Sequence, residues 1–167
     1  MKKRFGRSAL ILSLMAGMLA ACAGGISREA RSQVTYFGTF AEAQKSPDRF
    51  EGQTVLWGGK VISTQVKDGA TELTMLQIDL DSQERPGDGD QSHGRFIIRS
   101  AQFLDPALYP QGTPLTVVGR LQGAETRLIG EMHYTYPIVD PIEIKKWPLV
   151  RDSAPRFQFG IGVGTHF

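Results

Sequence analysis

The sequence predicts an all-β domain, a small closed barrel with one or two short helices, and three observations lead to it. Five or six segments after residue 54 alternate apolar and polar residues as strands do. The pair Gly58-Gly59 interrupts the first of them, where a small barrel needs a sharp bend or a close backbone approach. A helical turn or loop at residues 101–109 separates the third strand from the fourth, which is the element order of the OB fold.

The segment Thr39–Phe50 is predicted to begin as a short helix. Thr39 can cap its first turn, and Glu42 lies three residues on, which is the capping-box spacing. Phe40 and Ala43 fall on one face, and Pro47 ends the helix.

The strands are predicted from residues of one face that recur at every second position. The apolar sets are Val55, Trp57 and Val61; Leu76, Ile78 and Leu80; Phe96 and Ile98; Leu115, Val117 and Leu121; and Ile142 and Ile144. Residues 128–130 suggest a hairpin partner. An immunoglobulin-like sandwich is the alternative fold, but it needs about seven strands and fewer are found.

Length and composition limit the function classes. A chain of 167 residues fits one domain, and a single cysteine excludes an internal disulfide framework and a zinc site of several thiolates. Four of the 19 basic residues lie in the first seven positions, so the remainder carries 15 basic against 17 acidic groups. A mildly acidic body argues against nucleic acid as a partner, because such binding needs a basic face.

Residues 1–21 have the layout of a secretory signal peptide. The cationic stretch Lys2–Arg7 precedes an apolar run, Ala9–Ala21, of about 13 residues. A helix of that length spans about 20 Å, which is too short for a hydrocarbon core of about 30 Å.

The end of this leader, Leu19-Ala20-Ala21-Cys22, resembles the lipobox of bacterial lipoprotein precursors. The resemblance implies that the Cys22 thiol accepts a diacylglyceryl group and that the freed α-amine accepts a third acyl chain. Each buried CH₂ contributes about 0.8 kcal/mol, so such an anchor is effectively permanent. The resemblance also implies sorting to the outer membrane, because Ala23 stands where a lipoprotein retained in the inner membrane has Asp. The expected partner is therefore outer-membrane lipid, and the expected cofactor is none beyond the covalent lipid.

The remaining chain divides into three predicted parts. Residues 22–33 form a lipidated tether that reaches at most about 37–40 Å, residues 34–148 form the barrel, and residues 149–167 form a Gly-rich, aromatic tail. Phe157, Phe159 and Ile161 alternate with small or polar residues, as in the last strand of an outer-membrane barrel. Such a barrel needs at least eight strands, so a flexible or edge-pairing tail is the favoured interpretation.

Several segments together with the lipobox resemble one family. The segments are residues 57–62 (WGGKVI), 94–98 (GRFII), 103–109 (FLDPALY), 115–119 (LTVVG) and 136–139 (YPIV). From about Cys22 to Trp147 the chain resembles the Slp family, the starvation-inducible outer-membrane lipoproteins of Gram-negative bacteria. The resemblance implies an envelope protein of starvation or stationary phase with no catalytic residues, so only Cys22 carries over.

The residues themselves offer little other chemistry. His93, His133 and His166 are too widely spaced for a metal site, and the spacing of Asp88 and Asp90 lacks the remaining ligands of a calcium loop. No nucleophile-elbow, phosphate-loop or zinc-protease motif occurs. We therefore expect no metal and no enzyme activity.

The predicted function is a lipid-anchored outer-membrane lipoprotein that faces the periplasm. We expect it to stabilise the envelope or adapt it to stress by binding another envelope component, protein or glycan. The alternative is a module for a glycan or small anion on an exposed strand face. Arg95, Arg99 and Arg120 are the candidates, because the alternation that places Phe96 and Ile98 inside points the arginines outward.

Overall fold

The computed structural model describes residues 25–89 and 91–149. The leader, Cys22 and residues 150–167 lie outside this part of the chain. Five strands form the body: β1 (Thr54–Lys67), β2 (Ala70–Gln77), β3 (Gly94–Ser100), β4 (Pro114–Ile129) and β5 (Met132–Lys146). The helical elements are α2 (Arg28–Ser32), α3 (Phe40–Lys45), η2 (Pro47–Phe50) and η3 (Pro106–Leu108).

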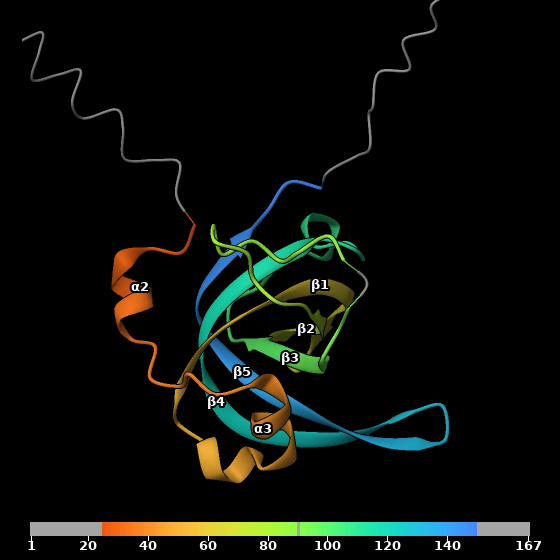
Figure 1. Ribbon diagram of the computed structural model, residues 1–167. Coiled ribbons are helices and arrows are strands. Elements are labelled where there is room, and N and C mark those ends of the chain that lie inside the picture. Colours follow the sequence, from red (N-terminus) through yellow and green to blue (C-terminus); the bar gives the residue numbers. More distant parts are fainter. Residues whose placement is uncertain (1–24, 90, 150–167) are drawn as a thin grey trace, which may run out of the picture.

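The strands close into a barrel in the order β1-β2-β3-β5-β4 (Figure 1). All pairs are antiparallel except β3 with β5, which meet in parallel at residues 97–98. This order, with η3 between β3 and β4, is that of an OB-type barrel, and it confirms the predicted fold class. Because the described strands close on themselves, the fold is a barrel and not the immunoglobulin-like sandwich that was the alternative.

Strand β1 changes its pairing partner near Gly58 and Gly59: residues 54–60 pair with β4, and residues 59–67 pair with β2. Gly59 pairs with Gln77 of β2 on one side and with Leu115 of β4 on the other. A Cβ atom at Gly59 would collide with the backbone carbonyl of Leu76. The predicted close backbone approach is confirmed, and it is the contact that lets a single long strand complete the barrel.

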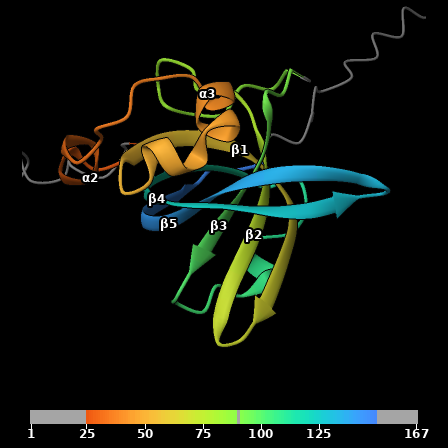
Figure 2. The ribbon, with the colours of Figure 1, turned by 90° about the horizontal axis from the view of Figure 1, so that it is seen from below.

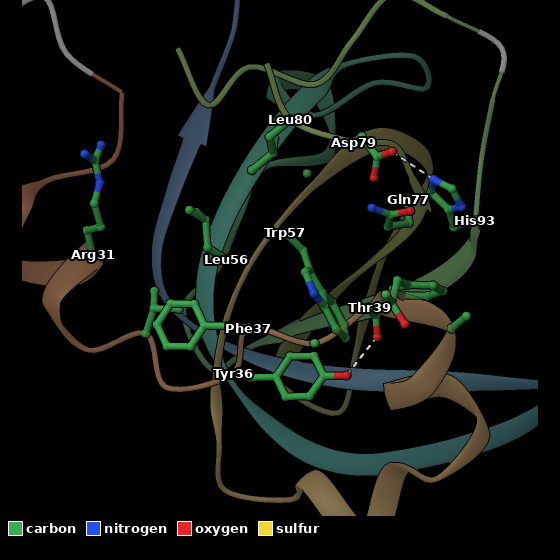
Figure 3. Close-up of a pocket in the computed structure, with 15 residues that line it drawn as sticks. Arg31, Tyr36, Phe37, Thr39, Leu56, Trp57, Gln77, Asp79, Leu80 and His93 are labelled. Carbon is green, nitrogen blue, oxygen red and sulfur yellow. Dashed lines mark hydrogen bonds and ion pairs between the residues drawn. The ribbon is translucent and has the colours of Figure 1, made fainter. Parts of the chain in front are cut away.

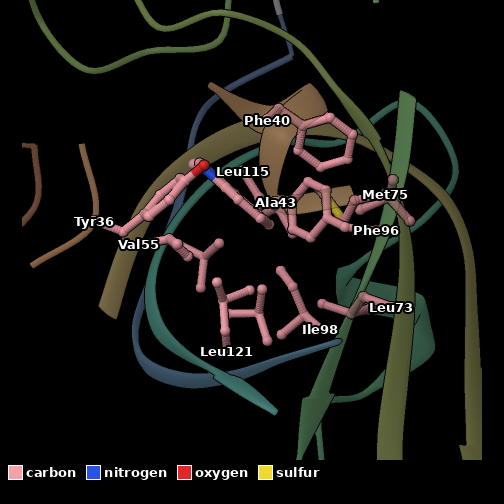
Figure 4. Close-up of a cluster of buried hydrophobic side chains, with 14 residues drawn as sticks. Tyr36, Phe40, Ala43, Val55, Leu73, Met75, Phe96, Ile98, Leu115 and Leu121 are labelled. Carbon is pink, nitrogen blue, oxygen red and sulfur yellow. The ribbon is translucent and has the colours of Figure 1, made fainter. Parts of the chain in front are cut away.

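The core fills the barrel, and the inward sets predicted for β1, β3 and β4 are buried in it (Figure 4). The set predicted for β2 was wrong: Leu73 and Met75 point inward, and Leu76 lies on the opposite face. The prediction for Ile142 of β5 was also wrong, since this residue is 40% exposed. Buried there are Val55, Trp57, Val61, Leu73, Met75, Phe96, Ile98, Leu115, Val117, Leu121 and Val139. Each large aliphatic or aromatic side chain of this kind contributes about 1.5–3 kcal/mol on burial, so the interior is the main source of stability.

Helix α3 closes one end of the barrel. Its capping box is present, because the Thr39 side chain accepts from the Glu42 amide and the Glu42 side chain accepts from the Thr39 amide. The buried ring of Phe40 packs edge-on against Trp57, with 4.9 Å between ring centroids. The helix is confirmed, and Pro47 both ends it and begins η2.

Helix α2 differs from the predicted tether of residues 22–33. Ile26 and Ala30 are buried, and with Val118 they form a second apolar cluster on the outside of the barrel. Ser27 donates from both its amide and its hydroxyl to the carboxylate of Glu143 on β5. Residues 26–33 therefore belong to the folded body, and the prediction of a tether through residue 33 was wrong for them.

The bounds of β2 and β5 also differ from the prediction. β2 ends at Gln77, and Leu80 lies in the following loop, where it bridges to Pro86 and packs on Gly58. β5 begins at Met132, well before the predicted Ile142. The pattern did not predict this part of the strand because it contains two prolines, at 137 and 141. Both prolines pair with β4 directly beside a register shift of the β4–β5 ladder, where proline is tolerated.

The distal part of the β4–β5 hairpin extends beyond the barrel as an arm (Figure 2). The arm comprises residues 122–137, which begin at the second register shift of the β4–β5 ladder. A turn at Gly130 and Glu131 ends the arm, with Gly130 at φ 60°. Within residues 25–89 and 91–149, no helix has the length and hydropathy to cross a membrane.

Candidate functional site

A groove of about 730 Å³ opens beside α3 at one end of the barrel (Figure 3). Three parts of the chain line it: the segment 34–41 that leads into α3, residues 56–58 of β1, and residues 77–80 at the end of β2. Arg31 and His93 complete the rim. The bend at Gly58 and the loop after Gln77 create this hollow, because the loop folds back toward β1.

The walls of the groove are mainly apolar and aromatic. Trp57, Tyr36 and Phe40 are almost fully buried and form its inner wall. The Tyr36 hydroxyl donates to the Thr39 carbonyl across 2.8 Å, which fixes the segment between them. Phe37 stands at the rim with 86% of its surface exposed. An aromatic ring this exposed at a concave site is a surface on which a ligand can stack.

Polar side chains gather at the other end of the groove. Gln77 is 5% exposed, and its Oε1 has no hydrogen-bond partner among the described residues. His93 Nε2 lies 2.9 Å from Asp79 Oδ2, directly beside Gln77 (Figure 3). A buried carbonyl oxygen without a partner costs about 1–3 kcal/mol, so this amide is an unfavourable feature of the interior unless a ligand completes it.

The three arginines predicted to share a ligand face lie on two strands that are not neighbours in the barrel. Arg95 and Arg99 both lie on β3, whereas Arg120 lies on β4, which is separated from β3 by β5. Arg120 pairs with Thr54 and Asp140 in its two ladders. A ligand face that spans these residues would have to cross β5 and stays a prediction.

Arg99 is instead part of an ionic cluster of four side chains. Its guanidinium donates to Glu72 of β2 and to Glu125 of the arm. Arg127 of the arm donates to the same two carboxylates. The cluster carries two positive and two negative charges, so Arg99 is neutralised and not available as a free anion site.

The pKa values of the cluster follow from these contacts. Burial raises the pKa of Glu72, but the hydrogen bonds from Arg99 and Arg127 outweigh burial, and the net pKa lies below its ordinary value. Hydrogen bonds from Arg99 and then Arg127 lower the pKa of Glu125. Both carboxyls are therefore held in the charged form.

The described residues offer binding surfaces and no assembled metal site. In residues 25–89 and 91–149, no three His, Cys, Asp or Glu side chains come together as metal ligands would. The lipobox residues Leu19, Ala20, Ala21 and Cys22 lie outside the described part. Sequence reasoning missed the groove, since its lining comes from separated segments. The one sequence signal was the aromatic pair Tyr36-Phe37, which lies just before the predicted helix.

Comparison with known proteins gives the family. The profile of the outer membrane lipoprotein Slp family matches residues 19–161. Outer membrane protein Slp of Escherichia coli K12 is 33% identical over 147 residues, covering 86% of this chain and 76% of that protein. The uncharacterized lipoprotein YeaY of the same strain is 35% identical over 106 residues, covering 64% of this chain. The match spans 54% of YeaY, about half of its length.

A solved structure is also similar in part. The small single-stranded DNA-binding protein of Streptomyces coelicolor is 16% identical and aligns with a TM-score of 0.41, covering 57% of this chain and 94% of that one. The OB-type fold is established here by the strand order of the barrel itself. The family profile spans most of the sequence, from the lipobox to beyond the last strand. The chain therefore belongs to the Slp family of outer membrane lipoproteins.

Proposed function

We propose that this protein is anchored to the outer membrane by lipid on Cys22, faces the periplasm, and acts by binding another envelope component without catalysing a reaction. The lipobox supports the anchor, because Leu19, Ala20 and Ala21 precede the chain's single cysteine. Membership of an outer membrane lipoprotein family supports the location. Three acyl chains at about 0.8 kcal/mol per buried CH₂ would keep the protein on the bilayer.

The position of α2 supports a close approach of the barrel to the membrane. The apolar cluster around Ile26 and Ala30 and the contact from Ser27 to Glu143 fix the chain from residue 26 onward. Four residues from Cys22 to Ile26 reach at most about 14 Å. The face around Gly25 would therefore lie against the lipid headgroups.

This face also carries the last described residues and several cations. Gly25, Lys145, Lys146 and Pro148 line one hollow there, together with Arg31, whose charge is paired with Glu84 of the same hollow. The chain ends of the described part thus lie on one side of the barrel (Figure 1). Lysine and arginine near a bilayer are attracted to phosphate headgroups, so the charges favour the same orientation.

The groove beside α3 is the observation that carries a binding function. It combines aromatic walls with an amide, Gln77, whose buried oxygen has no partner among the described residues. A concave, largely apolar site with a few polar groups is the usual form of a binding site. The ionic cluster of Arg99 is neutral, so the groove is favoured over the predicted arginine face as the binding surface.

Lipidation is tested by palmitate labelling and membrane fractionation of cells that produce the natural chain or Cys22→Ser. We expect labelled protein in the outer-membrane fraction for the natural chain and no label for the variant. The periplasmic orientation is tested by adding protease to intact and to permeabilised cells, with cleavage expected only after permeabilisation. Equal labelling of the variant would refute the anchor, and cleavage in intact cells would refute the orientation.

A further inference from the structure

We propose that the groove beside α3 is a saccharide-binding site that takes neutral sugar units of an envelope glycan. This inference rests on the proposed binding function and names its ligand class. Three properties of the groove support it: an amide that needs a partner, an exposed aromatic rim, and charges that disfavour an anion.

The first property is the state of Gln77. Its side chain lines the groove, is 5% exposed, and leaves Oε1 without a partner among the described residues. A ligand that only covers this amide with hydrocarbon would keep the cost of the unmade hydrogen bond. An acyl chain is therefore a poor occupant. A hydroxyl both donates and accepts, so it satisfies the amide in either of its two orientations.

The second property is the aromatic surface that adjoins the amide. Phe37 is 86% exposed at the rim, and the buried ring of Trp57 lies in the wall between Phe37 and Gln77 (Figure 3). A pyranose ring presents C–H groups on one face and hydroxyls around its edge. This combination places the C–H face on an aromatic ring while the hydroxyls reach Gln77 and Asp79.

The third property is charge. Asp79 Oδ2 lies 2.9 Å from His93 Nε2, and Arg31 at the opposite rim is paired with Glu84 across 2.7 Å. Since the one arginine that lines the groove is already paired and the Asp79 carboxylate repels an anion, the groove favours a neutral ligand.

A saccharide also fits better than an extended peptide. The described strands close into a barrel, so the groove has no free strand edge to which a peptide could add. The amides of Thr35 and Tyr36 in the segment beside the groove both donate to the Thr54 carbonyl and are already used. Peptide main chain would find few partners here, whereas a sugar needs only the side chains already described.

The test is a titration of the full lipoprotein, isotope-labelled and purified in a detergent without a sugar headgroup. The probes are the tetrasaccharide of N-acetylglucosamine and maltotetraose. We expect at least one of them to shift the side-chain amide signals of Gln77 and the indole signal of Trp57. The indole signal of Trp147, which is not in the groove, should stay unchanged. Phe37→Ala and Gln77→Leu should each weaken binding about tenfold.

The matched controls are Phe103→Ala, which removes another exposed aromatic ring, and Gln65→Leu, which removes an exposed glutamine of β1. Both should bind as the natural chain does. No shift with either sugar, or equal binding by Phe37→Ala, would overturn the saccharide site. Shifts of the same signals by decanoate or by an apolar peptide alone would also overturn it. Palmitate labelling is read separately, so failure here is distinguished from failure of the proposed anchor.

Discussion

Arg127 of the arm donates to Glu72 of β2 across 2.9 Å and so fixes the arm on the outer face of the barrel. The contact belongs to the ionic cluster with Arg99 and Glu125. OB folds usually bind their ligands on the face of the second and third strands, beside the loop between strands four and five. In this protein two side chains of that face, Glu72 and Arg99, are engaged by its own arm, and the groove beside α3 lies at a different place on the barrel.

The cluster predicts how stability depends on pH. A carboxyl whose pKa is lower in the folded state contributes stability above its unfolded pKa, and this contribution is lost as the pH falls through the folded pKa. Glu72 and Glu125 are both of this kind. We expect Glu72→Gln to lower the free energy of unfolding at pH 7 by about 1–3 kcal/mol. Between pH 5 and acid conditions, the variant should lose less stability than the natural chain does. Urea unfolding at several pH values measures both effects.

Glu131→Gln is the control for this series, because it removes an exposed carboxylate at the turn of the arm. It should leave both the stability and its pH dependence unchanged. If Glu72→Gln lost stability in acid as steeply as the natural chain, the cluster would not be the source of the acid sensitivity.

Local patterns predicted most of the barrel because each depends on near neighbours in the chain. The capping pair Thr39 and Glu42 and the inward sets of β1, β3 and β4 were all readable from spacings of two or three residues. The bend at Gly58-Gly59 was readable for the same reason, since glycine in mid-strand typically marks a bend or a close backbone approach.

The site was not readable because it is made by distant pairings. Arg99 and Glu125 are 26 positions apart in the sequence, and a register shift in β4 precedes Glu125. An alternation pattern cannot predict such a contact. Gln77 becomes a groove residue only because the loop with Leu80 folds back onto Gly58. Helix α2 is five residues long, too short for a periodic pattern, and its docking depends on a glutamate of β5 far along the chain.

The contact between Ser27 and Glu143 predicts a separable N-terminal segment. Glu143→Ala removes the acceptor of two hydrogen bonds but leaves Ser27 free to cap α2 through the Ala30 amide. We expect faster hydrogen exchange in residues 27–33 and a loss of about 1 kcal/mol in global stability. Asp140→Ala, which removes an exposed carboxylate from the same strand, is the control. Unchanged exchange in residues 27–33 would show that the apolar contacts of Ile26 and Ala30 hold α2 by themselves.

The bend in β1 predicts a strong effect of one methyl group. Gly59→Ala places a Cβ against the Leu76 carbonyl, which is backbone and cannot rotate away. Overpacking of this kind costs about 1–3 kcal/mol, and the position joins two ladders, so we expect at least that loss. Gly87→Ala is the matched control, since the nearest atom to its Cβ, the Asp79 carbonyl oxygen, is at an ordinary 3.7 Å. Thermal unfolding of both variants measures the difference, and equal melting temperatures would contradict the assigned bend.

The end of β5 predicts that the fold does not require residues 157–167. Trp147 follows β5 directly and forms two hydrogen bonds with the start of β4. Its amide donates to the Pro114 carbonyl across 3.0 Å, and its indole donates to the Thr116 hydroxyl across 2.9 Å. The core strands are complete by this point, so deletion of residues 157–167 should leave a cooperative melting transition at an unchanged temperature. Trp147→Ala is the contrasting variant, because it removes the indole contact and should lower the melting temperature by about 4 °C for each kcal/mol lost. A deletion that abolished cooperative melting would show that the tail contributes to the core.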